Sequence, residues 1–233
     1  MELLQAGVHF GHKTSKSHPK MSPFIFGIKN GVHILNLEET TKHLVKTLKF
    51  LKEQAKQGKK ILFVGTKKQA QEIIKKYALE CGMPSVSGRW LGGTITNFSV
   101  ISLLIQKMKT LRAQRESGEL VKYTKKEQLD FSREIVRLES IVGGLENLTG
   151  IPDVIYIWDI RSEETALREA KKKKIPIVAV CDTNVNPTGL DYIIPANDDA
   201  VKAIELITSL VAQAINEGKA EQKPVAQPMQ EKK

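Results

Sequence analysis

The sequence predicts an α/β fold: a mostly parallel β-sheet with helices on both faces, interrupted by a long inserted helical hairpin. Three observations predict it. Short, almost entirely apolar runs of the kind buried in parallel sheets occur at 60–65, 153–159 and 176–182. Segments with helical spacing of apolar residues alternate with these runs. Residues 98–145 instead contain two long helical patterns with no strand between them.

The N-terminal segment, residues 1–37, is predicted to be a basic arm followed by a β-hairpin. The opening thirty or so residues are rich in Gly, Lys and His and carry no sustained period, so we expect an irregular arm. In FIFGIKNGVHILNL (24–37), apolar residues alternate on either side of Asn30-Gly31, a dipeptide that favours tight hairpin turns.

The α/β body is predicted to comprise residues 38–97 and 146–217. Its first helix begins near Leu37, has apolar residues at 44, 45, 48 and 51, and ends before Gly58. The remaining elements are listed here in chain order: a strand at 60–65, a helix at 67–82, a weak strand at 84–88, a strand at 153–159, a helix at 162–174, and strands at 176–182 and 192–196. A last helix is expected from Asn197 to about Glu217.

The inserted segment, 98–145, carries two narrow apolar stripes with steps of three or four residues. The stripes comprise Phe98, Ile101, Ile105, Met108 and Leu111, and then Phe131, Ile135, Leu138, Val142 and Leu145. Stripes this narrow are typical of an antiparallel coiled-coil hairpin. Two ordinary helices that cover the core are the alternative.

The last segment, 218–233, has two prolines and few large apolar groups, and we expect a disordered tail.

The overall composition points to an anionic partner. The formal net charge is +10, and such a basic balance is typical of proteins that bind nucleic acid or anionic membranes. No apolar run is long enough to span a membrane and no signal peptide is visible. The two cysteines, Cys81 and Cys181, are far apart, which suggests a reduced, cytoplasmic protein.

Three groups of residues are candidates for contacts with nucleic acid. The arm is rich in lysine, and no acidic residue lies among these lysines. The loop SGRWLGGTITN (87–97) offers hydrogen-bond donors beside paired glycines. The tip of the hairpin is also basic. The candidate residues are Lys13, Lys16, Lys20 and Lys29 in the arm, Arg89, Trp90, Thr94, Thr96 and Asn97 in the loop, and Arg112, Arg115 and Lys122 in the hairpin. No sequence-reading module is present, so we expect contacts to the backbone and shape of a structured RNA. The lysine run 171–174 fits RNA contact and a favourable helix-dipole interaction equally well.

An enzyme that binds a nucleotide is the alternative function. VGTKKQ (64–69) leads from a strand into a helix whose N-terminus could attract a phosphate, but it lacks the glycine fingerprints of nucleotide-binding loops. Asp159 and Asp182 follow strands and could hold Mg²⁺, although Asp is also a common turn residue there. The pair His9 and His12 has no nearby cysteine to complete a zinc site. We therefore expect no catalytic residue, metal, cofactor or small-molecule substrate.

Several motifs resemble those of the ribosomal protein S2 family of bacteria. They are AGVHFGH (6–12), PKM (19–21), GVHILNL (31–37), RWLGGTITN (89–97) and DTNVNPTGLDYIIPANDDA (182–200). Differences from the family's usual residues occur at Ser17-His18, Asn36, Val185-Asn186 and Ala196, and leave the exact contacts near 15–20 open.

The resemblance implies a flavodoxin- or Rossmann-like body that carries a helical hairpin, and no catalytic activity. It implies a cytoplasmic protein of the small ribosomal subunit that binds 16S rRNA and helps to recruit ribosomal protein S1. Residues 98–145 favour a bacterial or organellar member, and no transit peptide is visible. The loop with Arg89, Trp90, Gly92 and Gly93 corresponds to the family's signature loop, which is expected to shape the start of the hairpin and the nearby RNA-facing surface.

Overall fold

The computed structural model describes residues 2–222 and contains a five-stranded parallel sheet. Its strands are β4 (Ile61–Val64), β5 (Ser85–Val86), β6 (Val154–Trp158), β7 (Ile177–Cys181) and β8 (Tyr192–Pro195). The spatial order is β5-β4-β6-β7-β8, and each neighbouring pair is parallel. Numbered within the sheet, this is the order 2-1-3-4-5 of flavodoxin-like folds. The predicted fold class is thus confirmed for the body.

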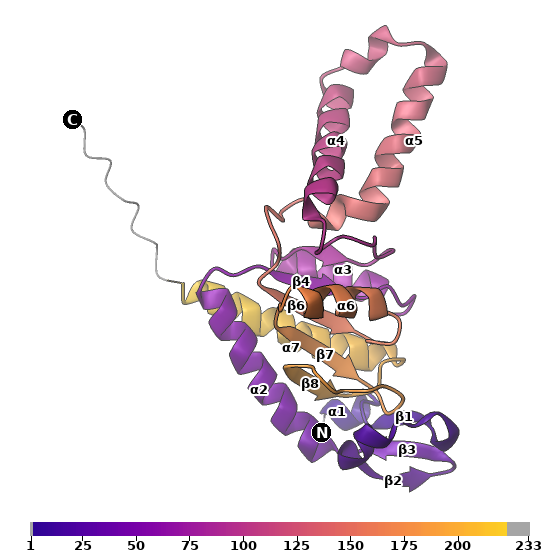
Figure 1. Ribbon diagram of the computed structural model, residues 1–233, viewed down its shortest axis with the longest axis vertical. Coiled ribbons are helices and arrows are strands. Elements are labelled where there is room, and N and C mark those ends of the chain that lie inside the picture. The colour runs from indigo at the N-terminus through magenta and orange to yellow at the C-terminus, as the bar shows by residue number, and fades with distance from the viewer. Residues whose placement is uncertain (1, 223–233) are drawn as a thin grey trace, which may run out of the picture.

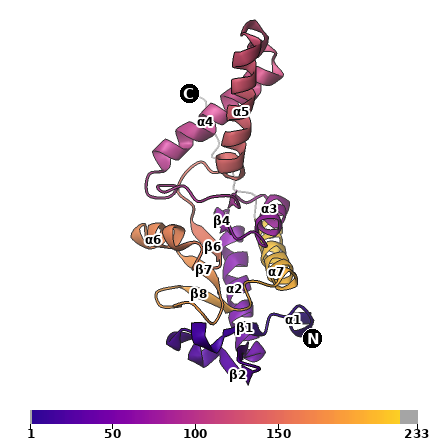
Figure 2. The same ribbon diagram turned by 90° about the vertical axis from the view of Figure 1, so that its right-hand side faces the viewer.

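Helices cover both faces of this sheet, as Figure 2 shows. α3 (Gln71–Glu80) and α7 (Val201–Ala220) lie on one face, with α2 (Leu37–Lys56) packed against α7 and β8. α6 (Glu164–Lys172) lies on the other face. The side chains of β6 alternate between two cores: Tyr156 and Trp158 enter the α3/α7 side, while Ile155 and Ile157 enter the α6 side. Burial on both faces explains why these strands are apolar throughout.

The N-terminal segment is more ordered than the sequence suggested. It contains α1 (Glu2–Gln5), β1 (Phe10–Lys13), η1 (Thr14–Lys16), η2 (Pro19–Phe24), β2 (Ile25–Lys29) and β3 (Val32–Leu35). The hairpin β2–β3 is confirmed, with Asn30 at φ 53° and Gly31 at φ 74° in its turn. The expectation of an irregular arm is wrong for β1, which joins β3 to complete a three-stranded antiparallel sheet.

The last helix, α7, is displaced along the chain relative to the prediction. It begins at Val201 because the Asn197 side chain accepts the backbone N–H groups of Asp199 and Ala200 in a turn just before it. It continues to Ala220, so assigning residues 218–220 to a disordered tail is wrong. This end of the helix packs closely against α2, since a Cβ on Gly218 would lie 2.9 Å from the Ala55 Cβ. The remainder of the predicted tail, 223–233, lies outside the described residues.

Two long helices project from the body (Figure 1). They are α4 (Phe98–Glu116) and α5 (Lys125–Val142), joined through η3 (Glu119–Lys122) and followed by η4 (Gly143–Leu145). Much of each predicted stripe is buried, including Met108 and Ile135, and Lys107 pairs with Glu134 across the two helices at 2.8 Å. Coiled-coil packing of this pair remains a prediction.

Candidate nucleic-acid interface

The signature loop encloses a carboxylate of the protein itself. Glu169 projects from α6 and accepts five hydrogen bonds from residues 90–96. The Trp90 indole N–H and the Gly93 backbone N–H donate to Oε1 at 3.0 and 2.8 Å. The backbone N–H groups of Ile95 and Thr96 donate to Oε2 at 3.0 Å each, and the Thr96 hydroxyl donates to the same oxygen at 3.1 Å.

The Glu169 carboxylate is held ionised in this loop. Glu169 is only 8% exposed. Burial works to raise the pKa of Glu169, but the N–H donors of the loop outweigh it and hold the pKa below its usual value. The side chains of Trp90 and Thr96 and three backbone N–H groups of the loop therefore bind an internal anion. This anion fixes the loop to α6 just before α4 begins.

The loop residues divide into a buried group and an exposed group. Thr94 is buried, and its hydroxyl donates to the Leu91 carbonyl at 2.7 Å. Arg89 and Asn97 are exposed at the two ends of the loop, and Asn97 accepts the hydroxyl of Ser99 at 3.0 Å. Of the five candidates only Arg89 and Asn97 are thus exposed, while Trp90 and Thr96 are half-buried.

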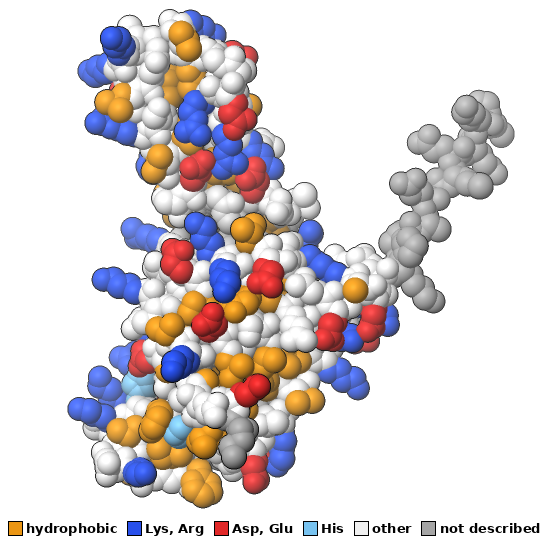
Figure 3. Space-filling model, turned by 180° about the vertical axis from the view of Figure 1, so that it is seen from behind, with side chains coloured by type: hydrophobic (Ala, Val, Ile, Leu, Met, Phe, Trp, Pro, Cys, Tyr) orange, Lys and Arg blue, Asp and Glu red, His pale blue; other side chains and the backbone are white. Residues whose placement is uncertain are grey.

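The remaining candidates lie on widely separated surfaces. Lys13, Lys16, Lys20 and Lys29 are exposed on the N-terminal segment, and Arg115 and Lys122 are exposed near the far end of the hairpin. Arg112 is engaged within the hairpin by Glu139 and Glu146, at 3.0 and 3.2 Å. Figure 3 shows that Lys and Arg side chains are distributed over both the body and the hairpin. The structure therefore brings together no single cluster from these candidates.

The alternative nucleotide site is already occupied by side chains of the protein. The Thr66 backbone N–H, which follows β4 and could meet a phosphate, donates to the Glu163 carboxylate at 2.6 Å. Glu163 is buried, and this burial raises its pKa. Two loops that resemble anion sites in the sequence are thus each filled by a glutamate near α6.

The N-terminal segment also covers the carboxyl end of the sheet, where ligands usually bind in this fold. The backbone N–H groups of His12 and His18 donate to the Thr183 hydroxyl and carbonyl, at 2.9 and 2.8 Å. The Asn197 N–H donates to the Val8 carbonyl at 3.0 Å. Gly11 approaches so closely that a Cβ there would lie 2.6 Å from the Thr183 side chain. These contacts dock β1 onto the body.

A cluster of charged groups lies beneath this covering segment. His12 Nδ1 lies 3.0 Å from Asp182, and His12 Nε2 lies 3.6 Å from Asp199. The Lys67 ammonium lies 2.8 Å from Asp198, 2.6 Å from Asp199 and 3.6 Å from Asp159. Asp159 and Asp182 do therefore meet at one edge of the sheet, as the sequence suggested, but around a lysine and a histidine.

The pKa values reflect the excess of carboxylates in this cluster. Burial and the nearby Asp159 raise the pKa of Asp198 to about 7, and Lys67 only partly offsets them. The carboxylates raise the pKa of Lys67 against its burial, and the hydrogen bond with Asp182 raises the pKa of His12. Sequence reasoning missed the roles of His12, Lys67, Asp198 and Glu169, since their partners lie tens of residues or more away along the chain.

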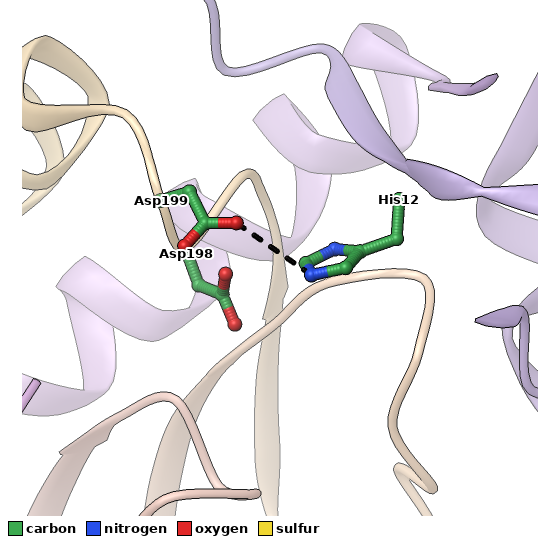
Figure 4. A group of neighbouring side chains, drawn as sticks. All are labelled: His12, Asp198 and Asp199. Atoms are coloured by element: carbon green, nitrogen blue, oxygen red, sulfur yellow. Dashed lines mark ion pairs between the residues drawn. The ribbon is translucent and has the colours of Figure 1, made fainter.

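Three side chains of the cluster have the chemistry and spacing to hold a divalent cation. His12, Asp198 and Asp199 each offer one ligand atom, and these atoms lie within 4.8 Å of one another (Figure 4). The Lys67 ammonium already supplies positive charge to both aspartates. A cation here would share these two carboxylates with Lys67, while Asp182 would orient the imidazole.

Within residues 2–222, none of the helices combines the length and the apolar character that crossing a membrane would need.

Comparison with known protein families gives one clear result. The family model described as "Ribosomal protein S2" matches residues 3–218, which is nearly the entire chain. This match agrees with the motifs of the signature loop and of the segment after β7. The chain therefore belongs to the ribosomal protein S2 family, whose members are structural, non-enzymatic proteins of the small ribosomal subunit that act in translation.

Proposed function

We propose that this protein binds 16S rRNA in the small ribosomal subunit, mainly through phosphates and the shape of the folded RNA, and that it helps to recruit ribosomal protein S1. The observation that carries the proposal is a row of positive charge on the N-terminal sheet. The proposals of rRNA binding and of S1 recruitment both rest on membership of the family together with this surface.

The row is formed by the strand register. Lys13 of β1 and Lys29 of β2 both lie opposite Val32 of β3. Residues directly opposite one another project from the same face of a sheet, so both lysines project from one face. Their Cα atoms are about 10 Å apart across two strand spacings. Both lysines are exposed, and residues 3–37 contain no Asp or Glu to neutralise them.

Other exposed basic residues lie apart from this surface, on the hairpin and at its root. Arg89 lies at the root of the hairpin, and Arg115 and Lys122 lie near its far end. We assign Trp90, Thr94 and Thr96 to shaping the signature loop, because their donors are used within the protein. Arg112 we assign to holding the two helices together.

The test is incorporation of a variant into subunits. We expect Lys13→Gln with Lys29→Gln to fold normally, since both side chains are exposed, but to co-sediment poorly with small subunits and to leave them depleted of S1. The matched control removes two exposed lysines of the body, Lys49→Gln with Lys202→Gln. Sedimentation of purified subunits at low and high salt measures both effects. Normal incorporation of the Lys13/Lys29 variant would show that this row does not bind rRNA.

A further inference from the structure

The carboxyl end of α6 presents a run of lysines that the surface described above does not include. Lys171–Lys174 are all exposed. Two residues earlier, Glu169 is held by the signature loop, so the end of α6 is anchored to the body. Positive charge at a helix C-terminus is favourable by itself, and a run of this kind therefore needs further evidence before it implies a partner.

The backbone at Lys174 determines where the last lysine of the run lies. The chain leaves α6 through a Schellman motif, in which Lys174 N–H donates to the Lys171 carbonyl at 3.1 Å and Ile175 N–H donates to the Ala170 carbonyl at 3.0 Å. Lys174 has φ 55°, the left-handed conformation that glycine adopts most readily. The other non-glycine residues with positive φ in the described chain are Asn30 and Asp159, types that tolerate it better. The left-handed turn therefore places the Lys174 side chain directly after the helix end, at a position where glycine would be less strained.

A second segment brings another lysine to the same place. Lys20, in η2, donates to the Thr188 hydroxyl at 2.8 Å, and Lys171 donates to the Thr188 carbonyl at 3.2 Å. Both lysines therefore meet at one residue of the loop between β7 and β8. Lys171 and Lys174 also line one shallow pocket, together with Gly189 and Asp191. The Asp191 carboxylate accepts the Ile177 N–H at 2.9 Å, so part of its charge is already engaged.

We propose that Lys20, Lys171 and Lys174, here named the α6 lysine cluster, form a phosphate-binding surface for structured RNA. This inference rests on the proposed rRNA binding and assigns a second contact surface to it. Three flexible ammonium groups from two segments suit an anionic backbone, which needs charge at several points and no specific pocket. The cluster itself offers no large apolar side chain of the kind that anchors protein interfaces.

Two variants test the cluster, with purified 16S rRNA as the probe and binding measured over a range of salt concentrations. The triple variant Lys20→Gln, Lys171→Gln, Lys174→Gln should bind roughly tenfold more weakly or worse. Its slope of log affinity against log salt should fall by roughly 0.7–0.9 for each lost phosphate contact, about 2 to 3 in total. Lys49→Gln in α2, on the opposite side of the sheet, is the control. It should change the affinity and the salt slope by no more than the loss of a single phosphate contact would.

Lys174→Gly separates a binding role from a structural one. Glycine relieves the left-handed strain, so this variant should melt at a higher temperature than the unaltered protein. It should nevertheless bind rRNA more weakly and lose about one unit of salt slope. If Lys174 serves only to end the helix, the Lys174→Gly variant should bind 16S rRNA as tightly as the unaltered protein.

The outcomes distinguish this inference from the proposed function. If the unaltered protein shows no salt-dependent binding to 16S rRNA, the proposed function itself fails, and the cluster with it. If it binds and the triple variant binds with the same slope as the control, the cluster is not an RNA surface, although the proposed function stands. If the triple variant binds rRNA normally but is lost from subunits, the cluster contacts an acidic protein instead, which also overturns the inference.

Discussion

Glu169 shows how one buried charge can organise a loop of the molecule. The loop supplies five donors to a single carboxylate, and hydrogen bonds to a charged group are stronger than those between neutral groups. We predict that Glu169→Gln lowers the free energy of unfolding by about 2–4 kcal/mol, because the amide replaces an acceptor by an NH₂ group that faces N–H donors.

Urea denaturation measures this loss. Glu164→Gln is the matched control in the same helix: Glu164 is exposed and pairs with Arg168 on the surface, so little change is expected. An equal loss in the two variants would mean that the loop does not depend on the enclosed charge. Sequence reasoning identified the loop and its donors but assigned them to an external anion, because the partner lies 73 or more residues away.

At the scale of elements, the contact between α2 and α7 depends on Gly218. A Cβ there would meet the Lys52 carbonyl and lie 2.9 Å from the Ala55 side chain. Alanine favours an isolated helix by about 1 kcal/mol over glycine, but the backbone contact cannot yield as a flexible side chain would. We therefore predict that Gly218→Ala destabilises the protein by about 1–3 kcal/mol.

The control for this prediction is Gly27→Ala in β2, where an added Cβ meets nothing within 4 Å. Thermal unfolding of both variants decides the question. A Gly218→Ala protein as stable as the unaltered one would mean that helix propensity outweighs the contact.

The elements that sequence reasoning placed correctly are those with local signals. The Asn30-Gly31 turn determines the hairpin, the buried runs determine the strands of the body, and spaced apolar residues determine α4 and α5. β1 has no such signal, since Phe10 is half exposed and the strand is only four residues long. Its partners are β3 and the loop after β7, and the latter lies about 170 residues away. Its strand structure therefore depends on tertiary contacts that no local pattern encodes.

At the scale of the whole molecule, the charged cluster around His12 joins the N-terminal sheet to the body. His12 lies next to β1's docking contacts with Thr183 and faces Asp182 and Asp199 of the body. The pKa of His12 is raised in the folded protein, chiefly by its hydrogen bond with Asp182. The protonated imidazole therefore stabilises the docked sheet fully below the unfolded pKa, about 6.5, and this stabilisation is lost as the pH rises through the folded value.

Asp198 changes stability in the same direction. Its pKa is raised to about 7, so the stability that its protonated form provides is lost between the unfolded pKa, about 4, and about pH 7. We predict that the melting temperature falls as the pH rises above about 6.5. His12→Gln should remove the part of this fall that lies above about pH 7, where Asp198 no longer contributes and glutamine has no proton to lose. Thermal unfolding at several pH values in this range checks the prediction, and hydrogen exchange at β1 would locate the change. If His12→Gln kept the full pH dependence, the imidazolium would contribute nothing to the docking, and the backbone contacts with Thr183 and Asn197 would have to hold the two sheets together on their own.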